Sequence, residues 1–143
     1  MNLGSINWLS VVLAACAAFA IGGAWYSPML LGRHWLEAAG LASEPASGPD
    51  RRNVMLCAFV ATLIMSTAMA FLIQSPTVQA QSGFHTPSQQ GAFYGMWVGL
   101  GWGFFAFMVV GLVEGRGWRY IAINGGCWIV AFTTMGGILG ALH

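Results

Sequence analysis

Long apolar stretches alternate along the chain with short polar connections. The apolar stretches cover residues 6–31, 54–73, 90–113 and 120–142. Each is about as long as the ~20-residue helix that crosses a hydrocarbon core of ~30 Å. Lipid cannot bond to open backbone groups, so such continuous runs favour helices over the alternating strands of a membrane barrel. The pattern predicts an all-α polytopic membrane protein, a single domain over residues 1–143 with four transmembrane helices in a compact bundle.

The first connection, residues 32–53, has a mixed apolar and charged character. Pro28 lacks the N–H that would continue the preceding helix, so we expect the first span to kink or end just before Arg33. Trp35 beside Arg33 and Glu37 then suits a short helix in the headgroup zone. By contrast, the loop at residues 74–89 shows no periodicity, and we expect a plain connector there.

Charged side chains occur only within residues 33–52 and 114–119. Because 57% of the chain is hydrophobic and 6% is charged, against ~25% charged residues in soluble domains, the composition argues against a water-soluble core. All five basic residues are Arg in these two windows, and the loop at 74–89 has none. The positive-inside rule therefore places both charged connections in the cytoplasm and both termini outside. A net charge of +1 gives no basic field, so we expect no nucleic-acid partner.

Four glycines, Gly91, Gly95, Gly99 and Gly103, follow one another at a spacing of four in the third span. This spacing places them on one helix face, where a neighbouring backbone can approach closely. The face can pack against another helix of the same chain. It can also form the seam of a homo-oligomer or bind another membrane protein.

A layer of polar side chains is predicted in the cytoplasmic half of the membrane. Counting ~1.5 Å per residue from the charged boundaries places it roughly 7–12 Å inside the hydrocarbon region. Its candidate members are Tyr26, Ser27, Thr62 and Asn124, with Glu114 near its mouth. The layer predicts a substrate site that opens to the cytoplasm between the first and fourth spans.

Asn124 allows a second interpretation of this layer. A buried amide is costly in lipid unless it is paired, so Asn124 needs a partner, for which Tyr26 and Ser27 are the candidates. Asn124 can therefore simply hold the first span to the fourth, without binding any substrate.

Groups suited to catalysis are missing from the predicted spans. No acidic or basic side chain lies mid-span, which argues against a proton-coupled exchanger. Cys16, Cys57 and Cys127 lie in three different spans, without the spacing of a zinc or redox site. We therefore expect no enzyme, no cofactor and no metal site.

Several short motifs resemble a family of small bacterial membrane proteins. They are Asn-Trp-Leu at residues 7–9, Gly-Gly-Ala-Trp-Tyr-Ser-Pro at 22–28, Gly-Arg-His-Trp at 32–35, Ile-Asn-Gly-Gly at 123–126 and Met-Gly-Gly-Ile-Leu-Gly at 135–140. The chain resembles the four-helix integral-membrane family called domain of unknown function 1761. This resemblance implies the fold, the topology and the inner (plasma) membrane of a bacterium, but no activity.

Two functions remain open on the sequence alone. The first is a non-enzymatic accessory or interaction subunit that associates through its glycine faces within the lipid bilayer. The second is a small transporter or channel that uses the polar layer between the first and fourth spans.

Overall fold

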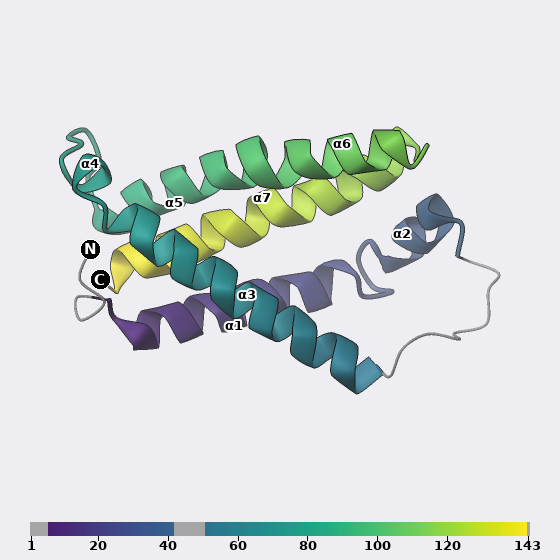
Figure 1. Ribbon diagram of the computed structural model, residues 1–143, viewed down its shortest axis with the longest axis horizontal. Coiled ribbons are helices and arrows are strands. Elements are labelled where there is room, and N and C mark those ends of the chain that lie inside the picture. The colour runs from purple at the N-terminus through teal and green to yellow at the C-terminus, as the bar shows by residue number, and fades with distance from the viewer. Residues whose placement is uncertain (1–5, 42–50, 143) are drawn as a thin grey trace.

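The computed structural model describes residues 6–41 and 51–142, and within them every regular element is a helix. Four segments are long and apolar enough to cross a membrane, which confirms the predicted fold class. The elements are α1 (Trp8–Trp25), α2 (Gly32–Ala39), α3 (Arg51–Ile73), α4 (Pro76–Gln79), α5 (Pro87–Val98), the π-helical turn η2 (Gly99–Phe104), α6 (Phe105–Val113) and α7 (Trp118–Ala141). The helices α5, η2 and α6 form one continuous rod (Figure 1).

α1 ends earlier than the first predicted span. The Asn7 side chain caps its first turn by accepting from the backbone N–H groups of Leu9 and Ser10. Its last helical residue is Trp25, because Pro28 disfavours helical geometry in the residue before it. A tight turn follows, in which the N–H of Gly32 donates to the carbonyl of Ser27 at 2.9 Å. α1 therefore has 18 residues, about 27 Å of helix.

Both predicted connections contain additional helical structure. In the first, α2 confirms the expected short helix, whereas residues 42–50 of this connection lie outside the described residues. In the second, the prediction of a plain connector was wrong, because Ser75 caps the single turn of α4. The side chain of Gln90 also donates to the carbonyl of Val78 at 2.6 Å and ties this loop to α5.

The two ends of the bundle differ in charge. The beginning of α1, the end of α7 and α4 lie at one end (Figure 1), and the Asn7 side chain donates to the carbonyl of Leu142 at 2.7 Å. α2 and the turn between α6 and α7 lie at the opposite end (Figure 1). The charged side chains of α2 and of this turn therefore share one end of the molecule, which we call the charged end.

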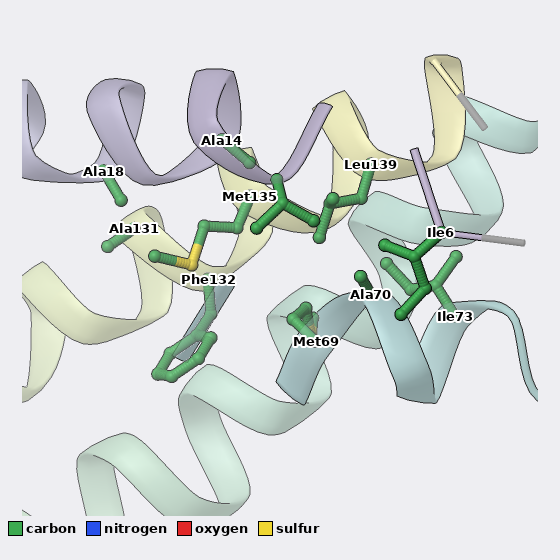
Figure 2. Close-up of a cluster of buried hydrophobic side chains, with 11 residues drawn as sticks. Ile6, Ala14, Ala18, Met69, Ala70, Ile73, Ala131, Phe132, Met135 and Leu139 are labelled. Carbon is green, nitrogen blue, oxygen red and sulfur yellow. The ribbon is translucent and has the colours of Figure 1, made fainter. Parts of the chain in front are cut away.

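α7 is the central helix, and it packs against α1 along one side and against α5 and η2 along another (Figure 1). α3 crosses α1 and reaches α7 near the end opposite the charged end. Figure 2 shows the resulting core, to which α3 contributes Met69, Ala70 and Ile73. The beginning of α3, residues 52–58, is exposed. The bundle is therefore packed tightly at one end and loosely at the charged end.

Candidate functional site

Two members of the predicted polar layer meet between α1 and α7. Tyr26 directly follows the last residue of α1, and its hydroxyl donates to Oδ1 of Asn124 at 2.8 Å. One residue earlier, the indole of Trp25 donates to the carbonyl of Ile123 at 2.9 Å. The pairing of Tyr26 with Asn124, one of the two pairings expected, is therefore present.

Asn124 uses both sides of its amide within the chain. While Oδ1 accepts from Tyr26, Nδ2 donates to the carbonyl of Tyr120 at 2.8 Å. Asn124 is only 4% exposed. Since its donor and acceptor both have partners, this arrangement fits the interpretation that Asn124 joins α1 to α7.

A cavity of about 280 Å³ lies beside this pair, between α1, α3 and α7. α1 lines it with Ala18, Phe19, Gly22, Gly23 and Tyr26, α3 with Met55, Ala58 and Thr62, and α7 with Cys127, Trp128, Ala131, Phe132 and Met135. The cavity exists because α3 leaves α7 towards the charged end. On one flank, the rings of Phe19 and Phe59 meet edge to face at 5.5 Å and join α1 to α3.

The cavity is uncharged and mostly apolar. Of its polar lining groups, the Tyr26 hydroxyl already donates to Asn124, and the Thr62 hydroxyl donates to the carbonyl of Ala58 at 2.8 Å. Their oxygens can still accept a hydrogen bond. The Cys127 thiol is a weak donor and the Trp128 indole carries one N–H, so the lining side chains offer few donors beside these acceptors.

The remaining predicted site residues lie elsewhere. Ser27 is in the turn after α1, and neither Ser27 nor Asn124 lines the cavity. Glu114 is exposed after α6 and pairs with Arg116 at 3.5 Å. The structure thus joins Tyr26 and Thr62 in one cavity and leaves Glu114 outside it.

α2 is held against the start of α7 at the charged end. The guanidinium of Arg116 donates to the carbonyl of Ala39 at 2.7 Å. Arg119 contacts Nδ1 of His34 at 2.7 Å and Glu37 at 3.5 Å. Glu37 therefore takes part in a contact between α2 and α7. Pairs as exposed as Arg119 and Glu37 stabilise a protein by only ~0–1 kcal/mol.

Trp35 connects α2 to the cavity wall. Its ring meets that of Tyr26 edge to face at 5.6 Å. Its indole N–H is buried and has no hydrogen-bond partner among the described residues. α2 therefore packs directly behind the tyrosine that borders the cavity.

The glycine face of α5 and η2 packs against α7. A Cβ at Gly91 would overlap with the carbonyl oxygen of Gly136, and one at Gly95 with that of Phe132. At Gly99 it would lie 2.7 Å from the Cα of Ile129, and at Gly103 2.8 Å from the Cβ of Trp128. All four glycines thus permit close approach to a helix of the same chain.

The π-helical turn keeps this glycine stripe aligned. Four residues of α-helix rotate by about 400°, which is about 40° more than a full turn. Glycines spaced by four therefore shift around the helix axis by about 40° from one to the next. η2 contains Gly99 and Gly103, and its wider turn compensates for part of the drift. No feature of the sequence reasoning had predicted this turn.

Sequence reasoning also missed most of the cavity wall. Met55 and Ala58 of α3 gave no signal, because apolar residues in a span resemble lipid-facing ones. Gly22 stood out only as the first residue of the motif at residues 22–28. The open space beside it, where an added Cβ would meet nothing within 4 Å, depends on the tilt of α3.

The chain belongs to the family described as protein of unknown function DUF1761, whose family model matches residues 9–140. This match confirms the resemblance seen in the sequence motifs. No curated protein and no solved structure matches the chain. The family assigns no activity, so a function has to be argued from the geometry.

Proposed function

We propose that this membrane protein binds a small, uncharged and mostly apolar molecule in the cavity between α1, α3 and α7, and that it catalyses no reaction. The volume of the cavity, about 280 Å³, supports this proposal. An engineered apolar cavity of ~150 Å³ is large enough to bind benzene, and natural ligand pockets begin at ~300 Å³. The cavity of this protein is therefore close to the size of a natural ligand site.

The lining favours an apolar ligand over an ion or a polar solute. A charged solute in this half of the membrane would need a charged or well-placed polar partner. Among the described residues no charged side chain lines the cavity, and the hydroxyl donors of its lining are already used. The proposal thus keeps the location of the predicted transporter or channel site and changes the chemistry of its ligand.

The predicted accessory role takes a modified form. Since the glycines of α5 and α7 face each other, we propose that a homo-oligomer or a membrane-protein partner contacts the outer helix faces instead. Trp97 and Trp102 are 54% and 78% exposed on such a face. In a bilayer these rings contact lipid by default, so the cavity supports the stronger hypothesis.

The orientation in the membrane is part of the proposal. We place the protein in the inner (plasma) membrane of a bacterium, with the charged end in the cytoplasm and both termini outside. Arg33, Arg116 and Arg119 gather at one end of the bundle, which supports this orientation by the positive-inside rule. We propose no nucleic-acid partner and no cofactor.

Photolabelling with an octanol that carries a diazirine tests the binding function. The probe is uncharged, and its hydroxyl can donate to the acceptors of the cavity. Residues that are nearly inaccessible from the outside report binding best, and Met135, which lines the cavity, is only 1% exposed. We expect adducts on Met135 and Cys127.

Two leucine substitutions supply the matched control. An added Cβ would meet nothing within 4 Å at Gly22, which lines the cavity, or at Gly101, which does not. We expect Gly22→Leu to reduce the yield of the Met135 adduct at least tenfold and Gly101→Leu to leave this yield unchanged. Equal labelling of Met135 in both variants, or adducts confined to outer faces in the parent, would refute the proposal.

A further inference from the structure

The shape of the cavity identifies its ligand more closely, if the proposed binding function is correct. Along α1 the lining runs from Tyr26 at the charged end to Ala18, and along α7 from Cys127 to Met135. Each path covers eight steps of about 1.5 Å, so the cavity is about 12 Å long and parallel to the helices. Dividing the volume of about 280 Å³ by this length gives a cross-section of about 23 Å², which is only about 5 Å across.

A narrow, apolar channel of this kind suits one hydrocarbon chain. The helices cross the membrane, so the long axis of the cavity runs in the same direction as the lipid chains around it. A compact ring would leave much of the length empty, and empty space forfeits dispersion contacts. An extended chain can contact the wall along the whole length.

The cavity also has an opening through which such a chain can enter. Gly23 of α1 and Met55 and Ala58 of α3 all line the cavity and are exposed. These residues belong to the parts of α1 and α3 that lie towards the charged end, beyond the contact between Phe19 and Phe59. The opening therefore faces the hydrocarbon of the leaflet at the charged end.

We propose that the cavity holds one acyl chain of a membrane phospholipid from the leaflet at the charged end, with the headgroup outside the cavity and the chain tip near Ala18 and Met135. Burial of CH₂ groups away from water favours apolar binding in aqueous solution, but a chain that moves from the bilayer gains no such contribution. Occupancy then depends on contact with the wall, and the bilayer supplies the ligand at high local concentration.

Phospholipids with a diazirine at a defined carbon test this assignment in proteoliposomes. One lipid carries the diazirine at the end of an acyl chain, and the other carries it near the ester. We expect the chain-end probe to label Met135 and the ester-proximal probe to label Met55 or Tyr26. Met135 is 1% exposed and Met55 is 47% exposed, so lipids around the protein reach Met55 much more readily than Met135.

The leucine variants again separate the cavity from the surface. Gly22→Leu should reduce labelling of Met135 by the chain-end probe at least tenfold, and Gly101→Leu should leave it unchanged. Gly23 also lines the cavity, and an added Cβ there would meet nothing within 4 Å, so Gly23→Leu serves as a second cavity-filling variant if Gly22→Leu does not fold.

The outcomes distinguish this inference from the proposed function. If the octanol probe labels Met135 but no phospholipid probe does, the cavity binds a small molecule and the assignment of a phospholipid chain is wrong. If neither probe labels Met135, both proposals fail. Labelling of Met135 by the ester-proximal probe instead of the chain-end probe would overturn the proposed chain direction.

Discussion

A single methyl group at Gly95 tests how α5 and α7 are held together. In Gly95→Ala, the added Cβ would overlap with the carbonyl oxygen of Phe132 on α7. The obstacle is backbone, which cannot rotate away as a side chain can. The two helices must therefore move apart or slide along each other, and the adjacent contact of Gly91 with Gly136 would open as well.

The expected change in the free energy of unfolding combines two costs and one gain. Overpacking of a well-packed contact costs typically ~1–3 kcal/mol, whereas replacing glycine by alanine inside a helix gains roughly 0.5–1 kcal/mol. Separation would also stretch the hydrogen bond from the Ser88 hydroxyl to the carbonyl of Gly137, now 3.0 Å long. Such interhelical bonds are worth ~0.6 kcal/mol on average in membranes. We expect a net loss of about 1–3 kcal/mol.

Thermal unfolding in a mild detergent measures this loss. At about 3 °C per kcal/mol for a chain of this size, Gly95→Ala should lower the Tm by about 3–9 °C. Gly101→Ala is the matched control, because it lies in the same rod and its Cβ would meet nothing within 4 Å. This control should keep or slightly raise the Tm.

Two results would count against the reasoning. If Gly95→Ala and Gly101→Ala unfold at the same temperature, α5 and α7 do not meet at Gly95 in the membrane protein. The second result is a parent whose Tm falls to that of Gly95→Ala when the parent is diluted. The glycine face would then join two copies of the chain, because only an association between copies depends on concentration.

Three further predictions concern hydrogen bonds and orientation. Tyr26→Phe should lower stability by about 0.6–1.7 kcal/mol because Asn124 Oδ1 loses its donor, and an unchanged Tm would contradict the pairing. Ser66→Ala should cost a similar amount, measured in the same way, because the buried Ser66 hydroxyl donates to the carbonyl of Val11 at 2.8 Å; a neutral effect would show that this bond adds nothing. In a cysteine-free background, Ser82→Cys should react with an impermeant thiol reagent added to intact cells, and reaction only after lysis would reverse the proposed orientation.

The relative heights of Tyr26 and Asn124 along the bundle were predictable from the sequence, whereas the directions of the side chains were not. Counting from Arg33 and Arg119 placed Tyr26 and Asn124 at similar depth, and they do form a hydrogen bond. The same count gives no rotation about the helix axis and no tilt. It grouped Ser27 and Glu114 with the layer, although neither lines the cavity. The cavity depends on the tilt of α3, and the early end of α1 depends on the tight turn that follows it.

The two sides of α7 suggest where binding would change the molecule. Towards α5, backbone lies against backbone at Gly136 and Gly140, which leaves no space for a side chain. Towards α3 and the charged end, Cys127 and Ala131 border a cavity instead of a packed helix. Interfaces without gaps resist deformation, and segments with few buried contacts open at low cost. An occupant of the cavity would therefore add contacts to the exposed beginning of α3, residues 52–58, and reduce its motion while α5 and α7 stay fixed.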